Sequence, residues 1–165
     1  MFPRCFRLCP FATLTKRLEV VPKLPRRTFS TSNDKWTQLE ARLKAFMQKE
    51  VMPAEKEVMD HMFSTDRWTV CSVIETLKTK AKEQGLWNMW IPLEIDHKAQ
   101  LGHGLTNEQY ARLAEIMGAV PFASECFNCS APDTGNMEVL IKYGNEAQKE
   151  EWLKPLLEGD SVRLP

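Results

Sequence analysis

The sequence has no long apolar run. Its longest apolar stretch, Leu86–Leu93, is interrupted by Asn88 and Pro92. A helix that crosses a membrane needs roughly 18 or more consecutive apolar residues. The sequence therefore predicts no membrane span. Its 43% hydrophobic and 27% charged residues are typical of an ordinary globular chain.

The sequence also lacks the motifs of several enzyme classes. None of its seven glycines lies in a Gly-x-Ser-x-Gly elbow, a Walker phosphate loop or a dinucleotide-binding pattern. The three histidines, His61, His97 and His103, have no metal-ligand spacing, and we expect them to be exposed to solvent. The acidic residues fit solvated helix faces and form no inward pair suited to acid–base catalysis. The sequence thus predicts no catalytic residue, no cofactor-binding residue and no metal ligand.

The formal net charge of zero hides two unlike parts. Residues 1–29 hold seven basic residues and one acidic residue, while the other 136 residues hold 15 basic and 21 acidic ones. An arginine-rich, acid-poor start is typical of a mitochondrial presequence, and Arg27-Thr-Phe-Ser30 favours cleavage after Phe29 in the mitochondrial matrix. A disordered basic tail is the alternative interpretation. The mildly acidic remainder has no basic stripe, which argues against a nucleic-acid partner.

Cys126-Phe-Asn-Cys129 is the one CxxC motif of the sequence. A redox dithiol is expected between a strand and a helix, and no strand pattern precedes Cys126. A zinc site would need two more ligands, but Cys71 is distant in sequence, and Cys5 and Cys9 lie in the predicted presequence. We therefore expect Cys126 and Cys129 to pack as small apolar residues, with a redox or a metal function as the alternatives.

Apolar residues recur at spacings of three and four, which is typical of amphipathic helices. The first helix is expected to begin near Asn33 or Asp34 and to be ended or kinked by Pro53, with a further helical piece over 54–62. Thr106 and Gln109 form a capping-box pattern, and Asp133 or Thr134 is the expected cap of a later helix. The predicted core positions on all these helices are Trp36, Leu39, Leu43, Phe46, Met47, Val51, Val70, Val73, Ile74, Leu77, Ala81, Tyr110, Leu113, Ala114, Met117, Met137, Leu140 and Ile141.

Three further segments are less regular. Residues 86–93 are apolar but too short for a helix of their own, so we expect a buried, extended linker, or alternatively a lone strand. Residues 94–105 are expected to form a loop, and 122–129 a short helix buried on several sides. The count is five to seven helices without a strand pair, so the predicted fold class is all-α.

Residues 144–159 contain several residue types that typically begin or end helices. Gly144 is expected to close the preceding helix in a left-handed conformation, and Asn145 with Gln148 forms another capping-box pattern. Pro155 cannot sit inside an unbroken helix, which predicts one helix ending near Leu153 and a short turn starting near Pro155. Gly159 is expected to end that turn.

A ligand surface is expected near the small, apolar run 120–131. Phe122, Phe127 and Ala131 could line an acyl-chain cavity, and Thr134 and Asn136 could add polar contacts to it. Plain helix–helix packing and helix capping explain the same residues equally well.

Two stretches carry a resemblance to a known family. Gly144, the Gln148-Lys149 pair, Leu153, Pro155 and Gly159 resemble the end of the N-terminal helical domain of acyl-CoA dehydrogenases. Ala131-Pro-Asp-Thr-Gly-Asn-Met137 is similar to the branch of that family whose animal members are often fused to other enzyme domains. The resemblance covers residues 35–160 and implies three domains: 1–29 as presequence, 30–160 as the helical domain, and 161–165 as a divergent tail.

The resemblance implies flavin chemistry that belongs to other parts of the enzyme. Family members use FAD to remove two hydrogens from the α and β carbons of an acyl-CoA, and a glutamate of a C-terminal bundle acts as the base. No residue of this chain matches the flavin motif or that glutamate segment. We therefore expect a truncated family member that binds no FAD and is inactive alone. The alternative is a helical interaction module that docks on full-length dehydrogenase subunits.

Overall fold

The structure is a computed structural model that describes residues 33–160; the predicted presequence and the divergent tail lie outside these residues. The described part is helical, as the all-α prediction requires, and no strand occurs between residues 33 and 160. No helix in this part is long and apolar enough to cross a membrane. The elements in order are α1 (Asn33–Phe46), η1 (Met47–Val51), α2 (Met52–Met62), α3 (Ser72–Glu83), α4 (Asn107–Met117), η2 (Ala123–Phe127), α5 (Asp133–Tyr143), α6 (Glu146–Gln148), η3 (Lys149–Leu153) and α7 (Lys154–Glu158).

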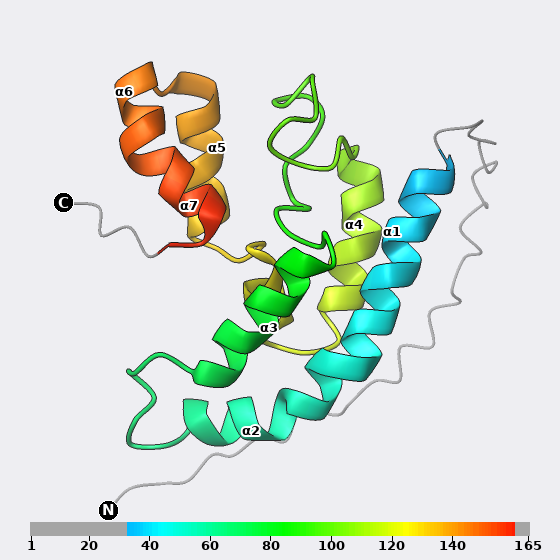
Figure 1. Ribbon diagram of the computed structural model, residues 1–165, viewed down its shortest axis with the longest axis vertical. Helices are drawn as coiled ribbons and strands as arrows, with labels where there is room; N and C mark the ends of the chain where they lie inside the picture. The colour runs from blue at the N-terminus through cyan, green and yellow to red at the C-terminus, as the bar shows by residue number, and fades with distance from the viewer. Residues whose placement is uncertain (1–32, 161–165) are drawn as a thin grey trace, which may run out of the picture.

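The helices form two groups. α1, α3 and α4 lie close together, while α5, α6 and α7 form a second group beside them, with the loop of residues 84–106 between the two (Figure 1). The connection between α2 and α3 stands at the opposite end of the molecule from α6 (Figure 1). Most predicted core positions are buried, but Val70 is exposed because it lies before the first turn of α3.

Both prolines predicted to interrupt a helix are accommodated in the same way. Pro53 and Pro155 are each the second residue of an α-helix that directly follows a five-residue π-helix, η1 or η3. In η1 the Met52 N–H donates to the Met47 carbonyl, and in η3 the Lys154 N–H donates to the Lys149 carbonyl. A π turn is wider than an α turn, and this widening admits a ring that lacks an N–H. The chain therefore changes helix type before Pro155 instead of stopping.

Residues 86–105 fold into a loop whose first part is buried and whose later part is held by one carboxylate. The predicted burial of 86–93 is confirmed, because Leu86, Met89, Trp90 and Ile91 are buried. The segment is not extended, however, since Asn88 has a positive φ and starts a turn. Asp96 accepts hydrogen bonds from the backbone N–H groups of Gln100, Leu101 and Gly102 at 2.9, 2.8 and 2.9 Å.

Capping was predicted well at two helices and wrongly at two positions. Thr106 with Gln109 and Asn145 with Gln148 both form complete capping boxes. α5 has no side-chain cap, because Pro132 occupies its N-cap position, so neither Asp133 nor Thr134 caps it. Gly144 is extended, with φ −67°, rather than left-handed. A glycine is needed there for a close approach, because an added Cβ would lie 2.6 Å from the Leu140 carbonyl oxygen.

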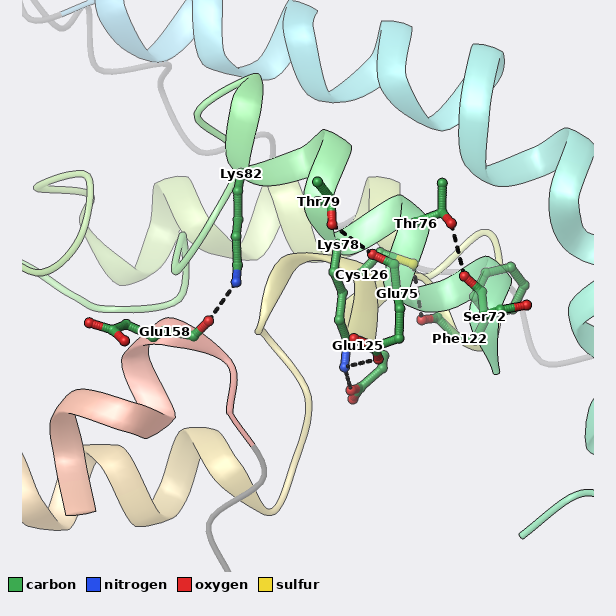
Figure 2. A network of polar contacts seen from close by, with 10 residues as sticks. All are labelled: Ser72, Glu75, Thr76, Lys78, Thr79, Lys82, Phe122, Glu125, Cys126 and Glu158. Atoms are coloured by element: carbon green, nitrogen blue, oxygen red, sulfur yellow. Dashed lines mark hydrogen bonds and ion pairs between the residues drawn. The ribbon is translucent and has the colours of Figure 1, made fainter. Parts of the chain in front are cut away.

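The carbonyl groups at the end of α7 accept hydrogen bonds from side chains of α3, of the loop before α4 and of the residue after η2. Asn128 Nδ2 donates to the Leu156 oxygen at 2.9 Å. Trp87 Nε1 and Asn88 Nδ2 donate to the Leu157 oxygen at 2.8 and 2.9 Å. Lys82 Nζ reaches the Glu158 oxygen at 2.5 Å (Figure 2). Since the last carbonyls of a helix have no partner within it, these four side chains form the capping cluster of α7.

A second tie joins α3 to the segment that precedes α5. Lys78 Nζ lies 2.7 Å from a carboxylate oxygen of Glu125 in η2 and 3.1 Å from one of Glu75 in α3 (Figure 2). The Lys78 side chain is mostly buried. Burial alone would lower the pKa of Lys78, but the contacts with Glu125 and Glu75 raise it overall, so Lys78 stays charged.

The segment 122–129, predicted as a helix, contains the 3₁₀ helix η2, which ends at Asn128 in a left-handed conformation.

We predict that replacing Asp96 with Ala lowers the free energy of unfolding by about 2 to 3 kcal/mol, because three backbone donors lose their acceptor. Burial alone would raise the pKa of Asp96, but hydrogen bonds from Gln100, Gly102 and Leu101 lower it below its usual value of 3.8. The stabilisation is therefore present above pH 4 and is lost as the pH falls through the folded-state pKa. Urea unfolding between about pH 2 and 7 measures both effects. A Glu94→Ala control should change neither, and an Asp96→Ala protein as stable as the native one would contradict the role given to Asp96.

Candidate functional site

A groove runs beside Tyr110 where α4, the residues before α5 and the start of α5 meet. It consists of two neighbouring cavities of about 360 and 280 Å³ that share Tyr110 and Cys129 in their walls. We call this feature the Tyr110 groove. The first cavity is lined by Trp90, Pro92, Asn107, Tyr110, Cys129, Thr134, Gly135 and Glu138. The second is lined by Tyr110, Ala114, Met117, Gly118, Val120, Pro121, Ser124 and Cys129.

The shared wall of the groove is neutral. Burial raises the pKa of the Tyr110 hydroxyl, and its contact with Cys129 raises it further. Burial raises the pKa of Cys129 to about 12. At neutral pH both groups therefore keep their protons, so this wall offers hydroxyl and thiol groups rather than charges. Glu138 is the one charged residue of the lining, and it is paired with Lys142 on the next turn of α5.

The five residues predicted to line an acyl cavity are placed differently. Thr134 lies in the wall of the first cavity. Phe127 is fully buried and packs edge-to-face on Phe46, with ring centroids 5.5 Å apart. Phe122 is buried, Ala131 is exposed and Asn136 is partly buried, and none of the three lines either cavity. The structure thus brings only Thr134 to the groove, and an acyl contact by the other four remains a prediction.

Sequence reasoning missed the aromatic part of the groove. Trp90 comes from the loop before α4 and Tyr110 from α4 itself. Tyr110 was predicted as a core residue because of its helical spacing, and spacing alone cannot show that a partly buried ring borders a cavity. The one available signal was the excess of aromatic and apolar residues in 86–93, which marks a buried loop.

The cysteines and one histidine complete the inventory of reactive groups. Cys126 and Cys129 are buried free thiols, which confirms that they pack as apolar residues. Between residues 33 and 160 no three His, Cys, Asp or Glu side chains are grouped as metal ligands. His103 was predicted to be exposed, but this is wrong. It is partly buried, its Nε2 lies 2.9 Å from the Trp87 carbonyl oxygen, and burial lowers its pKa.

Comparison with known proteins identifies the relatives of the described domain. A model of the N-terminal domain of acyl-CoA dehydrogenases matches residues 33–160. The chain is 54% identical over 122 residues to acyl-CoA dehydrogenase family member 10 of Mus musculus, covering 74% of this chain and 11% of that protein. It is 40% identical over 168 residues to acyl-CoA dehydrogenase family member 11 of Homo sapiens, covering 91% of this chain and 20% of that protein.

A solved structure extends this comparison to the fold. A chain from Mycobacterium abscessus, described as an acyl-CoA dehydrogenase, matches with a TM-score of 0.68 and 44% identity. The match covers 77% of this chain and 32% of that chain. The chain therefore spans a third or less of the length of these relatives.

We predict that Cys126 and Cys129 do not react with a thiol reagent in the native protein, because burial raises the pKa of each thiol to about 12 and the thiolate is the reactive form. In a Cys5→Ser, Cys9→Ser background, only Cys71 should be labelled, and all three remaining thiols should react in guanidinium. Mass spectrometry after timed labelling measures this. Rapid labelling of both buried cysteines in folded protein would revive the redox interpretation.

Proposed function

The chain belongs to the acyl-CoA dehydrogenase family, and from this we propose that residues 33–160 form the substrate-facing helical domain of a flavin-dependent fatty acyl-CoA dehydrogenase. In this proposal the domain contributes one wall of the acyl-chain site and has no turnover of its own. The match to the N-terminal domain over 33–160 supports it, as does the short share of each relative that the chain spans.

The Tyr110 groove is the observation that carries this proposal. The rings of Trp90 and Tyr110 line its first cavity, and small or apolar residues such as Ala114, Met117 and Val120 line its second. Aromatic and small apolar walls suit a hydrocarbon chain, and a few polar groups orient it. An acyl chain in the groove would place its alkyl end between α4 and α5, with the thioester end directed out of this domain.

The groove offers no positively charged side chain to the diphosphate of FAD. The cofactor carries a diphosphate, which proteins hold with cations or with backbone N–H groups at helix N-termini. The lining of both cavities contains no lysine or arginine, and its one charged residue is Glu138. We propose, as the family resemblance implies, that the flavin is held mainly by other domains of the enzyme. We also propose a mitochondrial matrix location, supported by the composition of residues 1–29.

An alternative is a helical module that docks on complete dehydrogenase subunits. Exposed apolar residues on α5, Val139 and Tyr143, and in the loop before α4, Leu93 and Leu101, favour it. Such a module would copurify with full-length subunits in a fixed ratio and would change their activity. The acyl-site proposal predicts no such change, so a titration of the chain into a complete dehydrogenase separates the two.

We predict that a chimera of mouse acyl-CoA dehydrogenase family member 10, carrying residues 33–160 of this chain in place of its matching segment, binds flavin and oxidises acyl-CoA. The chain alone should do neither, as measured by flavin absorbance and by reduction of an electron-accepting dye.

A Gly135→Leu substitution in the chimera should lower kcat/KM for the longest acyl chains about tenfold or more, because the new side chain fills the groove. The fold should tolerate the change, since an added Cβ at Gly135 meets nothing within 4 Å. Gly135→Ala is the matched control. A folded, flavin-loaded chimera in which Gly135→Leu leaves chain-length preference unchanged would refute the acyl-wall proposal.

A further inference from the structure

The connection between α2 and α3 carries a concentration of exposed apolar side chains. Nine large apolar residues of the described part are exposed, and four of them lie within residues 62–70. We call this segment the 62–70 tip. Met62 is 45% exposed, Phe63 79%, Trp68 87% and Val70 77%. Single exposed apolar residues are ordinary, but a group of them marks a surface that contacts something.

The tip lies away from the groove and from the capping cluster of α7. It joins the N-terminal end of α3, whereas Lys82 near the C-terminal end of α3 contacts Glu158. The 12 residues of α3 separate these ends by about 18 Å. Figure 1 shows the tip as a protruding end of the molecule, far from α5–α7. Neither of the two cavities includes a residue of 62–70.

Part of the backbone of the tip is bonded internally. The Phe63 N–H donates to the Met59 oxygen, and the Ser64 N–H and hydroxyl both donate to the His61 oxygen. The Thr69 N–H and hydroxyl donate to the Asp66 oxygen at 2.8 Å, while His61 Nε2 lies 3.1 Å from the Thr69 oxygen. Each of these internal bonds lowers the cost of moving the loop out of water, because an apolar phase penalises unpaired backbone groups.

The charges of the tip balance. Asp66 and Arg67 are its two charged residues, and Lys56 pairs with the neighbouring Asp60 at 2.7 Å. The Arg67 guanidinium lies 5.3 Å from the centre of the Trp68 ring. This places a cation beside an aromatic ring, an arrangement that suits the headgroup layer, where tryptophan concentrates and arginine meets phosphate. A net charge of zero matches a zwitterionic lipid surface rather than an anionic one.

We propose that the 62–70 tip inserts Phe63, Trp68 and Val70 into the interface of a phospholipid membrane and attaches the protein peripherally. The observations favour a lipid surface over a protein partner. No residue of the tip lines either cavity of the described part, and because the charges of Asp66 and Arg67 balance, the tip has no excess charge to direct a docking partner. Its exposed apolar side chains lie close together in the sequence, and such a group suits the headgroup boundary.

The test is flotation of the full 165-residue chain with phosphatidylcholine vesicles. The native protein should float with the vesicles, and a Phe63→Ser, Trp68→Ser variant should bind about tenfold or more weakly, because two apolar side chains no longer leave water. The matched control is Val139→Ser, Tyr143→Ser, which removes two exposed apolar side chains from α5 and should bind like the native protein. All three proteins should have the same helicity by circular dichroism, since the changed side chains are exposed.

Further conditions distinguish binding through the tip from other causes of flotation. Binding should not change between about 0.1 and 0.5 M salt, because it does not depend on charge. No flotation of folded native protein would overturn the proposal, as would equal loss in both double variants. Flotation only with anionic vesicles that salt abolishes would instead assign binding to basic residues elsewhere. If the tip variant floats like the native protein but differs from it in the mass measured by sedimentation, the tip forms a protein contact instead.

Discussion

The fold depends on the hydrogen bonds that the last turn of α7 accepts from the rest of the molecule. Three successive carbonyls, from Leu156 to Glu158, accept hydrogen bonds from side chains that lie far earlier in the sequence. Asn128 Nδ2 also donates to Asn88 Oδ1 at 2.7 Å, so the two asparagines form one bonded unit. Buried carbonyls without donors are costly. The capping cluster therefore joins the α5–α7 group to the α1–α4 group at one defined position.

The local backbone of the cluster is specialised for this task. Asn88 and Asn128 both have positive φ, 57° and 55°, a region that asparagine enters more easily than most residues. At Gly159, φ is 85°, and an added Cβ would lie 2.6 Å from the Trp87 ring. Lys82 Nζ lies over the Trp87 ring, 4.5 Å from the centre of the ring. These contacts hold α7, and α7 packs against α5; α5 and α4 both contribute walls to the Tyr110 groove. The shape of the groove therefore depends on the capping cluster, and the acyl-site proposal depends on the groove.

The helices and their caps could be predicted from local sequence, whereas the capping cluster and the Tyr110 groove could not. Spacing of Leu39, Leu43 and Phe46, and the capping boxes at Thr106 and Asn145, are local patterns with local causes. The left-handed conformation proposed for Gly144 failed because the close approach of the Leu140 carbonyl, not the dihedral angle, excludes a side chain there. The π turns before Pro53 and Pro155 also escaped prediction, because the proline rule describes an α-helix. Pairings such as Asn88 with Asn128, 40 residues apart, leave no periodic signal at all.

The capping cluster is tested most directly by a double-mutant cycle on Asn88 and Asn128, with free energies of unfolding from urea titrations. Glycine at each position keeps the positive φ and removes only the side chain. If the asparagines act as one bonded unit, the double variant costs less than the sum of the single variants by more than about 1 kcal/mol. Single costs that add to within about 0.5 kcal/mol would contradict the claim that this cluster joins the two helix groups.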